Sequence, residues 1–379
     1  MRNSRLCPRA IGLAAGLIFG AALLAQAQGP ALDGKTAEQA YKNIKVLTGT
    51  PANQLNQSMH LIEGATGMNC TVCHVEGQFD KDDKAPKATA RKMMQMVIDL
   101  NKNSFEGKQV VTCYTCHQGH PVPTAVPMVP VATPVEELET KQTFPSVDQI
   151  LAKYVAALGG EQAVRKVTSR VITGTQYIPT GPGGGILVPA AIERDLKAPN
   201  LVLTTYHTPT YTISDGFDGS QAWAQDMRGR VTQPMAIDQG RAKRDADFYF
   251  PLDLKQTYAK IEVLEVASVN GHEAYEVVAI PQGDTEERLY FDVVTGLLLR
   301  KQTALPTQAG LSPFHVDYDD YRDTGSGVKF PYTITMSPVN ARTVLNGTAT
   351  LYVTKVEDNA PVDSSKFAKP ESKAAAAAQ

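Results

Sequence analysis

The sequence predicts a multidomain fold: a small α-helical module followed by a mainly antiparallel β domain, an open, curved, barrel-like sheet with one or two helices. Apolar residues recur at helical spacing up to about residue 103, and alternating apolar runs of strand type begin near residue 169. A proline-rich stretch between them is typical of an extended linker. The expected segments are a signal peptide, 1–27, a helical module, 30–120, a linker, 121–143, a β domain, 144–370, and a disordered tail, 371–379.

The first segment has the pattern of an export signal. Arg2, Arg5 and Arg9 precede an apolar run, and an Ala-x-Ala sequence ends at Ala27. No later stretch reaches the ~20 apolar residues that a spanning helix needs. We therefore expect cleavage near Ala27, no transmembrane helix in the mature chain, and a periplasmic or secreted location. Cys7 lies before the apolar run and is expected to leave with the signal.

The net charge of the chain does not indicate a particular class of partner. The formal net charge is −2 over 379 residues, with basic and acidic side chains intermixed. A nucleic-acid-binding protein usually carries a basic patch or excess. We therefore expect no nucleic-acid partner.

Two amphipathic helices are expected in the helical module. Leu55, Met59 and Ile62 recur on one helical face, which Gly64 and Gly67 end. A second helix is expected from about residue 85 to 103, with an apolar stripe of Ala90, Met93, Val97 and Leu100.

Each expected helix is followed by a Cys-x-x-Cys-His motif. The two copies are Cys70-Thr71-Val72-Cys73-His74 and Cys113-Tyr114-Thr115-Cys116-His117. This motif is the attachment signature of c-type haem, because two thiols three residues apart bond to one porphyrin and the adjacent imidazole binds its iron. We predict two covalently bound haem c groups, held by Cys70, Cys73, Cys113 and Cys116, with His74 and His117 as proximal iron ligands.

Three other roles remain open for the cysteines. Paired Cys-x-x-Cys turns also gather four thiolates around structural zinc. An exported chain permits two disulfides, and a redox dithiol is a third option. None of these requires a histidine directly after each cysteine pair.

The sixth iron position needs a distal ligand. Met59 and Met93 occupy matching places on the helices before the two motifs, and we predict them as distal ligands, although methionine on an apolar helix face often only fills a core. Met96 is an alternative on the second helix. His60 and His120 would instead give bis-histidine iron, which lowers the reduction potential relative to methionine.

The segment Ala90-Arg91-Lys92-Met93-Met94-Gln95-Met96, followed by 111–119 with the second motif, resembles the photosynthetic reaction-centre cytochrome c subunit family over residues 36–123. The resemblance implies a helix, a turn and an attachment motif for each haem, with the helix donating methionine to iron. It implies Met93 for the second haem and Met59 for the first. The family's well-known members carry four haems, and Gln118 stands where they commonly have arginine.

The β domain is expected to begin with one short helix. Ser146 and Gln149 form a capping box, and Gly159-Gly160 ends the helix. A helical excursion is expected around 239–260, and Asn270-Gly271 marks a hairpin turn. The expected strands are 169–178, 201–214, 221–228, 261–267, 273–280, 288–292, 297–303, 328–337 and 343–354.

This pattern resembles the open β-barrel of lipoprotein-carrier and outer-membrane lipoprotein-sorting proteins. The segments that carry the resemblance are 291–299, 321–323 and 328–331. The resemblance implies that the concave face could hold an apolar small molecule, and a filled core is the alternative. The domain contains no nucleophile elbow, zinc helix or P-loop motif, and its glycine run 181–185 is interpreted as a loop.

Taken together, these patterns predict an exported dihaem c-type cytochrome that passes single electrons, with no catalytic residues. Its partner is expected to be a redox protein or a membrane electron-transfer complex. One alternative is a haem enzyme with an open sixth iron position. The other is a lipid-binding or apolar-ligand-binding envelope protein with an accessory cytochrome module.

Overall fold

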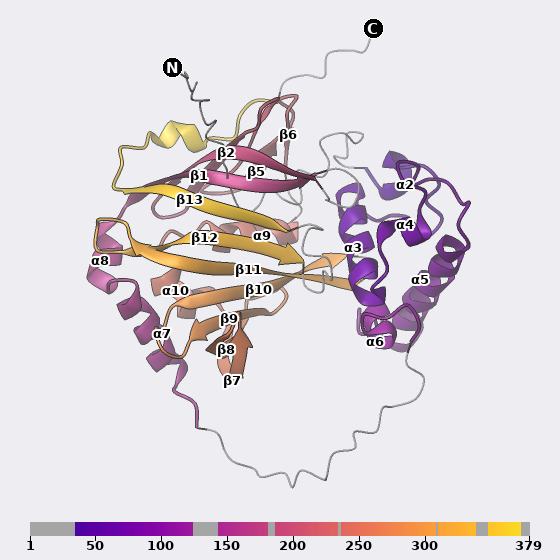
Figure 1. The fold of residues 1–379 in the computed structure, drawn as a ribbon, viewed down its shortest axis with the longest axis horizontal. Coiled ribbons are helices and arrows are strands. Elements are labelled where there is room, and N and C mark those ends of the chain that lie inside the picture. Colours follow the sequence, from indigo (N-terminus) through magenta and orange to yellow (C-terminus); the bar gives the residue numbers. More distant parts are fainter. Residues whose placement is uncertain are drawn as a thin grey trace, which may run out of the picture.

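The computed structural model describes residues 35–123, 143–180, 186–233, 236–307, 310–338 and 348–372. The expected signal peptide, most of the proline-rich linker, the glycine run 181–185 and the end of the tail lie outside these ranges. Within them, the chain forms a helical module and a β domain (Figure 1).

The β domain is one antiparallel sheet of thirteen strands. The strands follow one another in space in the order β6-β5-β4-β3-β2-β1-β13-β12-β11-β10-β9-β8-β7. Every pairing is antiparallel, so hairpins join most neighbours. The bounds are β1 Ser169–Thr180, β2 Ile186–Lys197, β3 Leu201–His207, β4 Thr212–Asp218, β5 Ala222–Gln225, β6 Val231–Thr232, β7 Lys260–Val269, β8 His272–Ile280, β9 Glu287–Asp292, β10 Leu298–Thr307, β11 Gly310–Asp323, β12 Lys329–Pro338 and β13 Ala349–Asp358.

Four helices pack against this sheet. They are α7 Val147–Ala157, α8 Glu161–Lys166, α9 Ala236–Asp245 and α10 Phe250–Thr257. Residues of α7 and α10 share a buried apolar cluster with β8 and β9. Ala242 of α9 and Ala246 just after it pack on β3, β4 and β5, and α9 also forms ion pairs with β9 and β10. Because those strands are far apart in the sheet order, the sheet must curve around α9.

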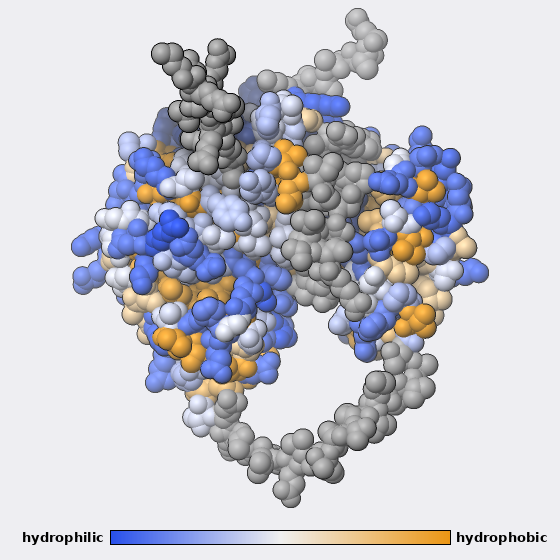
Figure 2. Space-filling model, viewed as in Figure 1, coloured by the Kyte–Doolittle hydropathy of each residue, from blue (hydrophilic) through white to orange (hydrophobic). Residues whose placement is uncertain are grey.

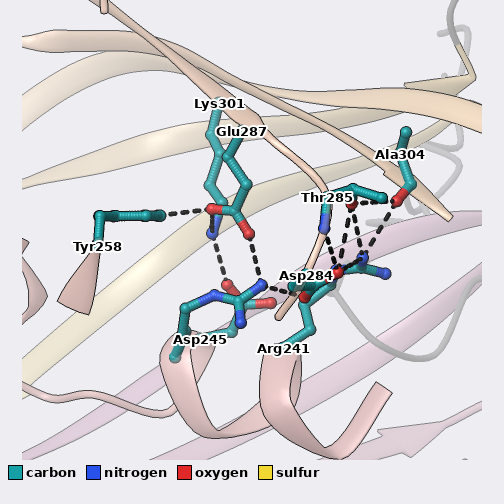
Figure 3. Close-up of polar contacts among 9 residues, drawn as sticks. Arg241, Asp245, Tyr258, Asp284, Thr285, Glu287, Lys301 and Ala304 are labelled. Carbon is teal, nitrogen blue, oxygen red and sulfur yellow. Dashed lines mark hydrogen bonds and ion pairs between the residues drawn. The ribbon is translucent and has the colours of Figure 1, made fainter. Parts of the chain in front are cut away.

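Buried charges join α9 to the far strands of the sheet (Figure 3). The Glu287 side chain is fully buried and pairs with Arg244 at 2.9 Å and with Lys301 at 3.0 Å. Tyr258, just after α10, donates a hydrogen bond to the same carboxylate at 2.5 Å. Asp284 pairs with Arg244 at 2.5 Å. Buried charges persist in a protein when they are paired in this way, so the network fixes the curvature of the sheet.

The fold class agrees with the sequence, with differences in detail. The capping box at Ser146 is present, and α7 ends before Gly159 and Gly160, both at positive φ. The expected strand 201–214 is two strands, β3 and β4, because Thr208 and Tyr211 close a turn between them. Strands β2, β6 and β11 and helix α8 were not expected.

The helical module contains, in the described residues, two longer helices and four short turns of helix. They are α2 Ala37–Ala40, η1 Ala52–Gln54, α3 Leu55–Thr66, α4 Cys70–Cys73, α5 Ala85–Ser104 and α6 Cys113–His117. Its small apolar core is built around Ala37, Leu47, Leu55 and Leu61. Helix α3 also contacts β10 and β11, so the module rests against the β domain at the ends of these strands (Figure 1).

Candidate haem-binding sites

Both Cys-x-x-Cys-His motifs form single helical turns. Asn69 precedes α4 and Thr112 precedes α6, where Thr112 and Thr115 form a capping box. A helical turn places residues i and i+3 on the same side, so the two thiols of each motif can face one porphyrin. All four cysteines are free thiols, three of them half-buried and Cys116 exposed.

The two motif histidines share the same hydrogen-bond arrangement. His74 Nδ1 lies 3.0 Å from the carbonyl oxygen of Phe79, and His117 Nδ1 lies 2.9 Å from that of His120. A carbonyl only accepts, so each Nδ1 carries the proton and each Nε2 is left with a free lone pair. Burial, the largest cause, lowers the pKa of His74, which favours the neutral ring that binds iron.

Apolar surface surrounds the motifs. Fourteen large apolar side chains are exposed in the described residues, and eight of them lie in the helical module: Val72, Phe79, Met93, Met96, Leu100, Val110, Tyr114 and Val122. Figure 2 shows hydrophobic surface between the hydrophilic patches of this module. A small soluble module gains stability when such surface is covered. Porphyrin rings seated beside the motifs would cover it, so the residues present fit haem.

The predicted distal methionines differ in their surroundings. Met59 is half-buried and packs in the core that α3 shares with Met94 and Ile98 of α5. Met93 and Met96 are exposed, at 40% and 49%. The stripe expected on α5 is therefore divided, because Val97 faces the core while Met93 and Leu100 face outward.

The alternative histidine ligands have other contacts. His60 Nδ1 lies 3.3 Å from Glu63 one turn further along α3. His120 is exposed, and its carbonyl orients His117.

The two motif turns are interlocked with the two longer helices. Helix α3 contacts α6, and α4 contacts α5. The amide of Gly119, just after the second motif, donates to Ala65 O of α3 at 2.8 Å. Each motif thus packs against the helix that precedes the other motif. The two sites are built into one unit rather than into two separate lobes.

Two buried polar residues that sequence reasoning missed hold the segments beside the motifs. Lys87 is 7% exposed and donates to Phe79 O at 2.8 Å, after the first motif. Asn101, also 7% exposed, bonds to the backbone just before the second motif. Both lie on the face of α5 that contains Val97, with spacings of ten and four residues from it. That periodicity was the only available signal, since polar residues on a helix usually face water.

The sequence alternatives for the cysteines can be compared with this geometry. No three His, Cys, Asp or Glu side chains converge in the described residues as a metal site would require. Burial raises the pKa of Cys70, Cys73 and Cys113, which favours the neutral thiol over the thiolate that zinc binds. In this arrangement the described thiols are not gathered around one point as a zinc knuckle would require.

Two Cys-x-x-Cys-His turns with oriented imidazoles and adjacent apolar surface define a c-type cytochrome module. The family resemblance of this part of the chain is confirmed, because residues 20–173 match the family described as "Photosynthetic reaction centre cytochrome C subunit".

Three curated relatives show the same likeness. The photosynthetic reaction center cytochrome c subunits of Thermochromatium tepidum and Rubrivivax gelatinosus are 33% and 36% identical, each over 25% of this chain and over 25% and 28% of the relative. Cytochrome c-554 of Chloroflexus aurantiacus is 33% identical over 21% of this chain and 20% of the relative. The chain spans about a quarter of the length of the curated relatives it matches.

Solved structures resemble the β domain. A putative outer membrane lipoprotein-sorting protein domain from Vibrio parahaemolyticus is 10% identical, with a TM-score of 0.36, over 53% of this chain and 87% of that one. A LolA superfamily protein from Nitrosomonas europaea is 13% identical, with a TM-score of 0.41, over 60% of this chain and 99% of that one. Likenesses of this size say nothing of what the sheet binds.

A pocket of the β domain lies beside α7. It measures about 230 Å³ and is lined by Pro145, Gln149, Ile150, Lys153, Tyr275, Phe291, Asp292 and Gly296. Pockets for small molecules usually measure ~300–1,000 Å³. An apolar ligand of this domain therefore stays a prediction. Among the described residues, no helix combines the length and apolar character needed to cross a membrane.

Proposed function

We propose that this protein is an exported dihaem c-type cytochrome that passes single electrons between redox partners. The observation that carries the proposal is the repeated pair of a motif histidine and a backbone carbonyl, His74 with Phe79 and His117 with His120. A carbonyl partner on Nδ1 fixes the ring orientation and leaves Nε2 for iron. A zinc or disulfide site would not need this arrangement twice.

Each haem would be held by two cysteines, a proximal histidine and a distal methionine. Cys70 and Cys73 would form the thioether bonds at the first site, and Cys113 and Cys116 at the second. His74 and His117 would bind iron through Nε2. Met59 and Met93 are proposed as distal ligands, and the exposed apolar side chains would exclude water from the ring edges. When bound, haem supplies a one-electron couple whose potential the ligands and their surroundings set.

The interlocked packing supports transfer between the two sites. Because α3 contacts α6 and α4 contacts α5, both sites belong to one small core and no hinge separates them. The external donor and acceptor are proposed to be a redox protein or a membrane electron-transfer complex, met in the periplasm or outside the cell. The contact of α3 with β10 and β11 is proposed to hold the haem module on the β domain.

The proposal is tested by haem quantification and visible spectra. Full-length protein, expressed with haem-maturation machinery, should contain two covalent haems per chain by the pyridine-haemochrome assay. Met59→Ala and Met93→Ala should each weaken the methionine-to-iron band near the red end of the spectrum. Met94→Ala is the matched control, because Met94 lies beside Met93 on α5 but packs in the apolar core. Absence of covalent haem would overturn the proposal.

The haem-enzyme alternative has a separate readout. An electron carrier with both iron positions filled should not take up carbon monoxide when reduced under native conditions. Ready uptake at one haem would favour the enzyme.

A further inference from the structure

The carbonyl oxygen that orients the first proximal histidine accepts a second, charged donor. Phe79 O lies 3.0 Å from His74 Nδ1 and 2.8 Å from Lys87 Nζ. The Lys87 ammonium also donates to Lys81 O at 2.5 Å and lies 3.1 Å from Asp82 Oδ1. With 7% of Lys87 exposed, this positive charge is held in place beside the first motif.

The second motif lacks this feature. His117 Nδ1 has the His120 carbonyl as its partner at 2.9 Å, and no described cationic side chain donates to that oxygen. The ion pair of this region, Lys108 with Glu106, is exposed on both sides, at 72% and 81%. Exposed charges are screened by water and salt, so their effect on a haem is small.

The charges around the first motif do not balance. Lys45, Lys87 and Arg91 all pair with the single carboxylate of Asp82, at 2.7, 3.1 and 2.8 Å. Lys84 donates to the carbonyl of Thr71, inside the first motif. Of the neighbouring carboxylates, Glu76, Asp80 and Asp83 belong to exposed residues. Glu63, whose side chain is 21% exposed, lies near Cys70 but is outnumbered by the less exposed Lys87 and Arg91. The less screened charges near His74 are therefore positive in sum.

We propose that Lys87 is a positioning residue that makes the first haem the higher-potential one, so that electrons pass from the second haem to the first. This inference rests on the proposed function, since it requires haem at both motifs. Two effects act in the same direction. Ferric haem carries one more positive charge than ferrous haem, so a nearby ammonium disfavours the oxidised form. By sharing Phe79 O, Lys87 also weakens the pull of that carbonyl on the His74 proton, which makes the imidazole a weaker donor to iron.

The test is a spectroelectrochemical titration of the full-length, haem-loaded protein. Wild type should show two one-electron transitions. Lys87→Gln should lower the upper transition by about a tenfold change in the reduction equilibrium, about 59 mV, and leave the lower one in place. Lys87→Arg, which keeps the charge, should restore most of the wild-type potential. Lys108→Gln is the control beside the second motif and should move neither transition.

A second variant keeps the inference testable if Lys87→Gln does not fold. Arg91→Gln removes another cation that pairs with Asp82 but does not contact Phe79 O, and should lower the same transition by a smaller amount. Unchanged potentials in both variants, an equal shift of both transitions, or movement of the lower transition alone would overturn the inference. The pyridine-haemochrome assay separates this failure from that of the proposed function, because two haems per chain would still be found.

Discussion

Asn101 holds the backbone of Val111 through both polar atoms of its amide. Asn101 Oδ1 accepts from Val111 N at 2.9 Å, and Nδ2 donates to Val111 O at 2.7 Å. The same Oδ1 also accepts from Val110 N at 3.1 Å. Helix α5 thereby fixes the segment that enters the second attachment motif at Cys113.

Replacing Asn101 should therefore damage the second site more than the first. Asn101→Ala leaves part-buried backbone groups of Val110 and Val111 without this partner, at a cost of about 1 kcal/mol. We expect a lower midpoint in urea denaturation and a haem content falling toward one per chain. Gln95→Ala is the control, since Gln95 bonds only to the exposed Asp99 side chain on the same helix. Full haem loading and unchanged stability in Asn101→Ala would contradict this role.

Gly159 and Gly160 make a matched pair at the end of α7. Both have positive φ, at 120° and 89°. A Cβ at Gly159 would lie 2.0 Å from Gly327 O, whereas one at Gly160 would meet no atom within 4 Å. Gly160→Ala should thus cost only the backbone strain, about 1–3 kcal/mol, and Gly159→Ala about 1–3 kcal/mol more. Thermal denaturation of both variants measures the difference, and equal losses would refute the close approach.

Local signals made much of the fold predictable. The Ser146 capping box and the Asn270-Gly271 turn depend on neighbouring residues, and both are present. Strand β2 was missed because Arg194 and Asp195, buried in a central strand, interrupt the apolar alternation. Strand β11 was missed because aspartates interrupt its apolar pattern, and the partner of Asp317, Arg300 at 2.5 Å, lies on the neighbouring strand.

In the candidate sites too, local sequence features were predictable and tertiary contacts were not. Cysteine and histidine spacing is local, so the attachment motifs could be found in the sequence. Lys87 and Asn101 act on segments that fold back onto α5, and their partners are known only once the chain has folded. The interlocked contacts of α3 with α6 and of α4 with α5 are likewise tertiary.

Glu287 is the anion on which the buried network of the β domain depends. Its carboxylate pairs with Arg244 and Lys301 and accepts from Tyr258. Glu287→Gln would leave two buried cations short of a counter-charge, which costs about 3–5 kcal/mol. We expect a marked fall in the β-domain melting temperature. Glu286→Gln, at a more exposed site beside it, should change stability little, and similar losses in both variants would argue against the network.

The same carboxylate predicts how stability depends on pH. Burial alone would raise the pKa of Glu287, but the charges of Lys301 and Arg244 outweigh it and hold the pKa at about 2, below the ordinary 4.5. A depressed carboxyl pKa gives stability that is fully present above the unfolded value and is lost as pH falls toward the folded value. Wild type should therefore lose stability relative to Glu287→Gln between about pH 4.5 and 2. Parallel urea-denaturation curves for the two proteins across that range would contradict the assignment.

Substitution of the histidines tests whether methionine or histidine is the distal ligand of each iron. His60 pairs with Glu63 at 3.3 Å, and His120 contributes its backbone carbonyl, not its ring, to the His117 contact. His60→Ala and His120→Ala should therefore leave the visible spectrum and both reduction potentials unchanged, because an alanine at 120 keeps that carbonyl. A histidine that ligates iron would instead give a large rise in potential or an open-site spectrum when removed. Such a change in either variant would show that the histidine, and not the corresponding methionine, is the distal ligand. His117→Ala, which removes a proximal ligand, serves as the positive control.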